Sequence, residues 1–144
     1  MSGTAVATRF RVEINGTEED WSLGDWNKVE GLTVERDVHE QREGGQNGFV
    51  HRLPGRAKYQ NVKLTRPITK ATADVAAWVS KVKSVSRSST ATITVLDSEG
   101  EEVTAWTLEA VFPARWTGPT LESGANQAAT ETLELAHHGF LESA

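Results

Sequence analysis

The chain has 144 residues, with fifteen Lys and Arg, twenty Asp and Glu, and no cysteine. This length predicts one domain over residues 1–144, and the lack of cysteine excludes disulfides, thiolate metal sites and a cysteine nucleophile. The net charge of −5, with both signs spread along the sequence, disfavours sequence-specific nucleic-acid binding. No apolar run is long enough to suggest a signal peptide or direct membrane binding.

The first strand is predicted at residues 8–14, where apolar and charged side chains alternate. It ends at Asn15-Gly16, a dipeptide typical of tight turns. Residues 17–28 show no clean period, so we expect a loop or a broken short strand that closes one end of the core.

Two long strands are predicted next, at residues 29–42 and 61–66, because apolar and polar side chains alternate in both. Alternation predicts that each strand is half-buried, with Val38 among the inward residues of the first. Residues 43–48 contain three glycines, and Pro54-Gly55 is a second breaker. The chain is therefore expected to fold back between the two strands.

One helix is predicted at residues 70–83, with Thr69 as its N-cap and Asp74 near its positive end. Four apolar residues form a stripe that should face a sheet. They are Val75, Trp78, Val79 and Val82. Replacing Trp78 with alanine should be among the most destabilising core substitutions.

The last third predicts a strand at residues 90–96, a hairpin partner at 103–112, and a closing strand at 130–136. Trp106 in the second of these is expected in the core, together with Phe112. Residues 113–125 are expected to form a surface excursion. The predicted fold is mainly β (α+β), an antiparallel barrel or sandwich of about six strands with one covering helix.

No catalytic, cofactor or metal site is predicted. His39 and His51 lie on separate segments, and His137-His138 point to opposite faces of a strand, so the histidines do not converge as metal ligands do. The glycines of residues 44–48 lack the lysine and the following helix of a phosphate-binding loop. Neighbouring carboxylates on the strand at residues 29–42 are expected to be solvated rather than catalytic. An enzyme is therefore not expected.

A set of motifs between about residues 9 and 140 resembles the inner tube proteins of contractile phage tails and of phage-tail-like (extracellular contractile) injection systems. The motifs are Val29, Gly31-Leu32, Arg42 to Asn47, Leu53-Pro54-Gly55, Tyr59, Asn61-Val62, Leu64, Arg66, Trp78, Trp116, Gly118-Pro119, Asn126, Glu131, Leu133, Leu135 and His138-Gly139. The motifs are specific as a set, whereas each one separately is weak.

The resemblance implies a structural subunit of a tail-tube-like fold. It implies homo-hexameric rings that stack into a tube, with a channel for cargo protein or DNA. Sheath, baseplate and tape-measure proteins are the implied partners. Assembly in the bacterial cytoplasm is implied, as a component of a virion tail or of a released injection particle.

Two sets of functional residues are expected. The first is a loop that contacts another subunit or ring and becomes ordered there: Arg42, Glu43, Gly44, Gly45, Gln46, Asn47, Gly48, Leu53, Pro54 and Gly55. The second is the polar parity of the strands, expected to face the channel and to make it acidic: Thr33, Glu35, Asp37, His39, Asn61, Lys63, Thr65, Glu109 and Glu134.

Three alternatives stay open. One is the related tube protein of a type VI secretion apparatus, which gene neighbourhood would distinguish. Another is a monomeric β-sandwich that binds a small ligand or sugar through Trp21, Trp26 or Trp116, which light scattering would separate from a ring-forming protein. An enzyme is the third alternative and has the weakest support.

Overall fold

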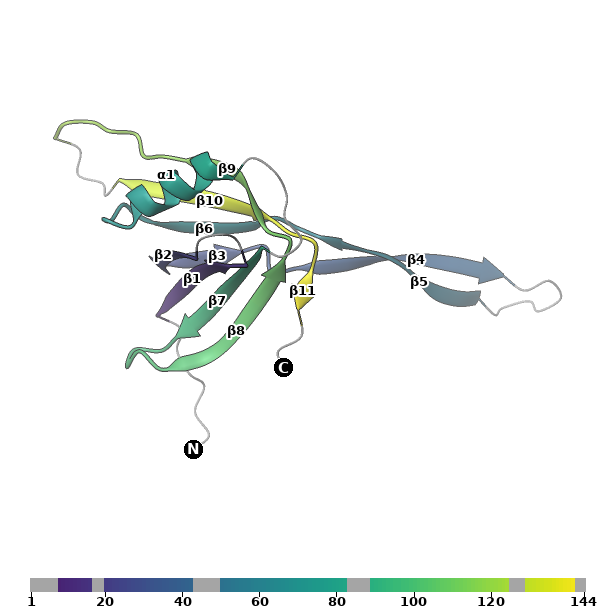
Figure 1. The fold of residues 1–144 in the computed structure, drawn as a ribbon. Helices are drawn as coiled ribbons and strands as arrows, with labels where there is room; N and C mark the ends of the chain where they lie inside the picture. The colour runs from purple at the N-terminus through teal and green to yellow at the C-terminus, as the bar shows by residue number, and fades with distance from the viewer. Residues whose placement is uncertain (1–7, 17–19, 43–49, 83–88, 125–128, 142–144) are drawn as a thin grey trace.

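The computed structural model describes residues 8–16, 20–42, 50–82, 89–124 and 129–141. These residues form three antiparallel sheets and one α-helix (Figure 1). The five-stranded sheet has the order β11 (Phe140–Leu141), β8 (Glu102–Glu109), β7 (Thr90–Leu96), β1 (Arg9–Asn15), β2 (Trp21–Trp26). The four-stranded sheet has the order β3 (Lys28–Glu30), β6 (Val62–Pro67), β10 (Thr130–Ala136), β9 (Phe112–Thr117).

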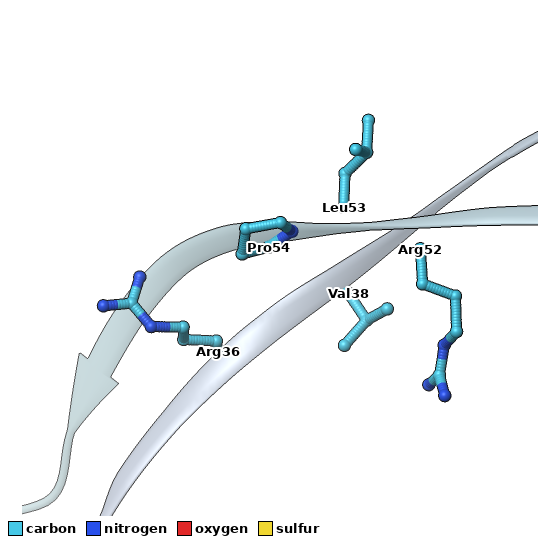
Figure 2. Close-up of a pocket in the computed structure, with 5 residues that line it drawn as sticks. All are labelled: Arg36, Val38, Arg52, Leu53 and Pro54. Atoms are coloured by element: carbon cyan, nitrogen blue, oxygen red, sulfur yellow. The ribbon is translucent and has the colours of Figure 1, made fainter.

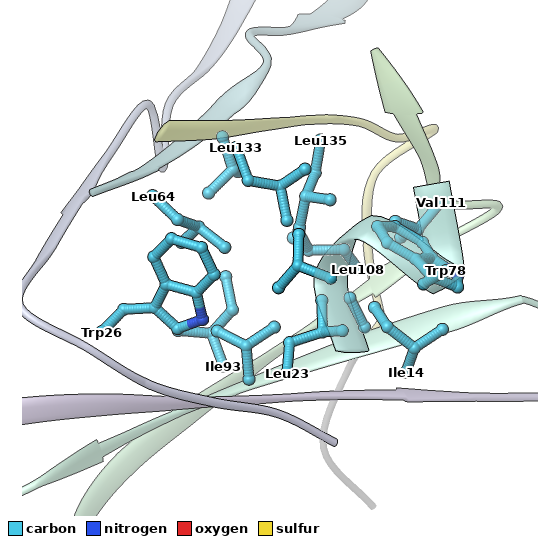
Figure 3. Packing of buried hydrophobic residues seen from close by; sticks show 14 residues of the cluster. Ile14, Leu23, Trp26, Leu64, Trp78, Ile93, Leu108, Val111, Leu133 and Leu135 are labelled. Atoms are coloured by element: carbon cyan, nitrogen blue, oxygen red, sulfur yellow. The ribbon is translucent and has the colours of Figure 1, made fainter. Parts of the chain in front are cut away.

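The core lies between these two sheets and is closed by helix α1 (Thr72–Lys81) (Figure 3). Strands β1, β6, β7 and β10 each bury alternate residues, as expected for strands with one face on a core. The fully buried aliphatic residues include Val12, Ile14, Leu23, Val62, Leu64, Ile93, Leu108, Leu133 and Leu135. The mainly β fold with one helix is thus confirmed, as open sheets rather than a closed barrel among the described strands.

Helix α1 is shorter than the prediction of residues 70–83. Its N-cap is Ala71, so the assignment of Thr69 as N-cap was wrong. Thr69 instead accepts the Ala71 N–H in the turn before the helix, at 3.1 Å. The predicted stripe does face the core, with Val75 and Trp78 buried and the remaining two valines partly buried at its edge.

Residues 17–28, expected to form a loop or a broken short strand, contain a short strand with an irregular pairing. Trp21–Trp26 forms β2 and pairs with β1, and its Leu23 and Trp26 are fully buried. A register shift in this pairing and a positive φ of 81° at Gly24 interrupt the alternation. The period of two is therefore absent from a segment that is nevertheless a strand.

The predicted strand at residues 103–112 is divided between two sheets. Strand β8 ends at Glu109, Ala110 has a φ of 50°, and β9 begins at Phe112 in the other sheet. Trp106 is 37% exposed and Phe112 only partly buried, whereas Val111 fills the core, so both core predictions need correction. Residues 112–117 are also a strand, which corrects the expected surface excursion.

The predicted long strand at residues 29–42 is likewise two strands. It breaks at Gly31, whose φ is 91°, and a Cβ there would lie 2.2 Å from the Asn61 carbonyl oxygen. Its second part, β4 (Val34–Arg42), pairs with β5 (Val50–Tyr59) and not with residues 61–66. These two strands form an arm that extends away from the two larger sheets (Figure 1).

Candidate assembly interface

The arm, defined as β4 and β5, exposes apolar side chains, of which Val34 and Val38 lie on the parity that the sequence pattern predicted to face inward. Val34, Val38 and Leu53 are each about half exposed, with Val38 at 50%. A two-stranded ribbon is marginally stable in water when neither face is covered. Exposed apolar side chains on a ribbon whose two faces are both uncovered make the arm a candidate interaction surface.

The pairing register assigns the arm residues to two faces. Val34 lies opposite Tyr59, and Val38 lies opposite Pro54. Residues directly opposite in an antiparallel pair share a face. We call the face that carries these pairs the Val38 face; its remaining members are Arg36, Glu40, Arg52 and Ala57. The other face carries Glu35, Asp37, His39, Leu53 and Lys58.

The arm twists at a bulge where Gly55 meets Asp37. The register shifts between Arg36 and Val38, and a Cβ on Gly55 would lie 2.7 Å from the Asp37 carbonyl oxygen. Asp37 also forms an exposed salt bridge with Lys58, with Nζ and Oδ1 3.4 Å apart. Pro54-Gly55, predicted as a second breaker between the two strands, therefore lies at a bulge inside β5 and does not end the strand.

A shallow hollow of about 370 Å³ lies at this twist. Figure 2 shows Val38 and Arg52 on one side of the ribbon and Leu53 on the opposite side. The lining residues are Arg36, Val38, Arg52, Leu53 and Pro54. Two guanidinium groups beside apolar carbon suit a segment that carries both an apolar side chain and a carboxylate.

The predicted contact loop falls partly on the arm. Leu53, Pro54 and Gly55 lie in β5, and Arg42 is the last residue of β4. The other predicted members lie outside the described residues: Glu43, Gly44, Gly45, Gln46, Asn47 and Gly48. Their role as a subunit contact stays a prediction.

The residues predicted to face a channel lie in separate places. Glu35, Asp37 and His39 are on the arm, Lys63, Thr65 and Glu134 share the outer face of the four-stranded sheet, and Glu109 ends β8 in the other sheet. Thr33 precedes β4 and Asn61 precedes β6. They do not form one continuous strand face.

The outer face of the four-stranded sheet carries mixed charge. The strand pairing places five charged residues on this face: Lys28, Glu30, Lys63, Arg115 and Glu134. Cations thus slightly outnumber anions here. The channel-facing assignment stays a prediction, and an acidic channel does not follow from this sheet.

Sequence reasoning missed a buried ion pair that joins the two sheets and the helix. Arg66 of β6 and Glu131 of β10 are 2% and 0% exposed, with Nε and Oε2 3.0 Å apart. Thr72 at the start of α1 donates to the same carboxylate, and Trp116 of β9 donates to its other oxygen at 3.0 Å. Each carboxylate oxygen is therefore hydrogen-bonded, as a buried charge requires.

The guanidinium of Arg66 also reaches the five-stranded sheet. Nη1 donates to the Leu23 and Asp25 carbonyls at 2.6 and 3.1 Å, and Cζ lies 3.9 Å from the centre of the Trp26 ring. A Cβ on Gly24 would lie 2.8 Å from Nη1, so glycine leaves the space that the guanidinium occupies. A detectable signal was present in the sequence, because Arg66 and Glu131 continue the inward parity of their strands.

His137 joins the base of the arm to the end of β10. Its Nε2 donates to the Gln60 carbonyl at 3.1 Å, and its Nδ1 accepts the Gly139 N–H at 3.1 Å. The ring also lies against Tyr59 and Phe140, with centroids 5.5 and 5.3 Å away. Both bonds fit the neutral ring, since a protonated Nδ1 could not accept a hydrogen bond.

Burial lowers the pKa of His137 below its ordinary value of 6.5, and the neighbouring His138 acts in the same direction, although the Gln60 hydrogen bond opposes this. A lowered pKa in the fold means that the unfolded chain binds the proton more tightly. The neutral His137 ring therefore makes its full contribution to the stability of the fold above pH 6.5, and this contribution is lost as the pH falls through the lowered pKa. We expect His137→Gln to lose less stability than the wild type between about pH 7.5 and about pH 5.

Urea unfolding at the two pH values measures this difference. His138→Gln is the control, because it removes only the smallest contribution to the lowered pKa of His137, from an exposed neighbouring ring, and it should keep most of the wild-type pH dependence. Equal pH dependence in the wild type and His137→Gln would contradict the expectation.

The described residues give little support to a metal site or to ligand binding through exposed tryptophans. They contain no group of three or more His, Asp or Glu arranged to hold a metal ion, and no helix in them is long and apolar enough to cross a membrane. Of the tryptophans considered for ligand binding, Trp26 is buried, and Trp21 and Trp116 are partly buried against the core.

Comparison with known structures gives near full-length similarity. The chain is 28% identical to a chain in the structure of the anti-feeding prophage (AFP) baseplate, with a TM-score of 0.75 and coverage of 98% of this chain and 96% of that chain. It is 23% identical to a chain in the PVC sheath/tube terminator of an extracellular contractile injection system, with a TM-score of 0.76 and 99% of both chains covered.

A type six secretion system protein is more distant in fold, with 16% identity, a TM-score of 0.53, and coverage of 89% of this chain and 79% of that chain. No curated protein sequence matches the chain significantly. The family model of the T4-like virus tail tube protein gp19 matches residues 6–141. This match confirms the predicted resemblance: the chain belongs to the T4-like virus tail tube protein gp19 family.

Proposed function

We propose that the chain is the inner tube subunit of an extracellular contractile injection particle. The observation that carries this proposal is the 28% identity to the AFP baseplate chain over nearly the whole of both chains. The PVC structures share the fold with higher TM-scores than the type six secretion protein, which favours the injection particle over the type VI tube.

The proposed assembly is a hexameric ring that stacks on further rings to form a tube. The arm supports it, because its apolar residues are exposed in one subunit and a neighbouring subunit would bury them. The proposed partners are sheath, baseplate and tape-measure proteins, with cargo protein or DNA in the channel. The chain acts by forming a single-domain structural wall and not by catalysis, after assembly in the bacterial cytoplasm.

The purified chain is expected to form rings and tubes at high concentration or when a baseplate nucleates them. Deleting residues 44–48 should leave a folded core that no longer builds tubes, because the deletion shortens the segment that joins the two arm strands. Light scattering and negative-stain microscopy measure assembly, and tryptophan fluorescence checks the fold. A wild-type chain that stays monomeric under both conditions would overturn the proposed function, and normal tubes from the deletion variant would overturn the role of this loop.

A further inference from the structure

We propose that the Val38 face of the arm binds the segment Leu121–Glu122 of a second copy of the chain. This proposal rests on the proposed function and specifies one contact within the tube. On one side of the contact, Val38 and Pro54 supply apolar carbon while Arg36 and Arg52 supply positive charge around the hollow.

The segment after β9 has the complementary chemistry. Leu121 is 78% exposed, the highest value among the large hydrophobic residues that the structure describes, and Glu122 follows it in the chain. A leucine this exposed gains free energy when it enters an apolar hollow. The adjacent carboxylate can accept hydrogen bonds from a guanidinium group, which are stronger than neutral ones.

The two surfaces lie at opposite ends of the subunit. The arm extends from one end, and the connection after β9 runs out from the other (Figure 1). A chain therefore cannot insert its own Leu121 into its own arm. Because the contact joins different surfaces on two copies, it propagates from subunit to subunit and closes into a ring or continues as a filament.

Another exposed acidic segment competes for the same hollow. At the start of β8, Glu101 and Glu102 precede Val103, which is 43% exposed. Val103 lies at a bulge in β8 between Glu102 and Thr104, which both pair with β7, so the pairing on either side holds its backbone, and its side chain is less exposed than that of Leu121. Leu121 lies outside any strand, and its side chain is more exposed than that of Val103, which favours Leu121 as the occupant of the hollow.

Disulfide trapping tests the contact directly, because the chain contains no cysteine. Val38→Cys with Leu121→Cys in one chain should give a ladder of cross-linked oligomers on oxidation, both in solution at high concentration and in assembled tubes. Lys58→Cys with Leu121→Cys is the matched control, since Lys58 lies on the other face of the arm. Val38→Cys with Val103→Cys tests the competing segment.

Charge reversal gives a second, independent measurement. Glu122→Arg should raise the concentration needed for assembly on the order of tenfold, and adding Arg52→Glu should restore it. The contact is overturned if tubes form but the Val38–Leu121 pair gives no ladder, or if either other cysteine pair cross-links equally well. Failure of the wild type to form rings or tubes is a different result, which overturns the proposed function itself.

Discussion

Replacing Glu131 with leucine is expected to lower the free energy of unfolding by about 3–5 kcal/mol, because the buried Arg66 guanidinium then lacks its countercharge. Both side chains are almost fully buried, so water cannot replace the lost carboxylate. The substitution also removes the acceptor for Thr72 and Trp116. Since the domain as a whole is expected to be stable by only about 5–15 kcal/mol, this loss is large.

Urea unfolding followed by tryptophan fluorescence measures the effect, and the double variant Arg66→Met with Glu131→Leu is its main control. Removing both charges should recover much of the stability, because no unpaired charge then stays buried. The exposed pair of Lys28 and Glu30, 3.2 Å apart, gives the surface control. Glu30→Gln should change stability by about 1 kcal/mol or less. A loss below about 1 kcal/mol in Glu131→Leu would contradict the prediction.

Replacing Trp78 with alanine is expected to lower the free energy of unfolding by about 3–5 kcal/mol through lost packing and the cavity left behind. Trp78 is 1% exposed and is the largest residue that α1 contributes to the core (Figure 3). Its loss would also weaken the attachment of the helix over the space between the two sheets.

Trp106→Ala is the matched control, because it deletes the same atoms from a side chain that is 37% exposed. Its loss of stability should be clearly smaller, since less area leaves water on folding. Thermal and urea unfolding of both variants compare the two sites. Equal losses would mean that Trp106 is as well packed as Trp78, against the burial seen here.

Alternation in the sequence determined several elements correctly. Strands β1, β6, β7 and β10 were predicted within a few residues, because each has one face on the core and one in solvent. The apolar stripe of α1 was predicted for the same reason at helical spacing. For the segment that contains β2, the pattern predicted either a loop or a broken short strand, because Gly24 and a bulge interrupt its period.

The motif set predicted the family, and it included Arg66, Trp116 and Glu131 before their contact was known. The contact itself depends on β6 and β10 being paired, which places Arg66 directly opposite Glu131 although 65 positions separate them. The separation of Arg66 and Glu131 along the sequence does not indicate how close they lie in the fold. The available signal was a charged residue at an inward-facing position of each strand. Only the pairing of β6 with β10 brings the two charges together as an ion pair.

The arm was decided by tertiary structure. Its strand β4 carries Val34 and Val38 on one face together with Arg36 and Glu40. The sequence predicted Leu53, Pro54 and Gly55 as contact residues without showing which faces they occupy. Local alternation determines that two faces differ, but it does not determine what covers either of them. In this chain, the strand breaks at Gly31 and β4 extends away from the body, so its apolar side chains stay exposed instead of entering the core.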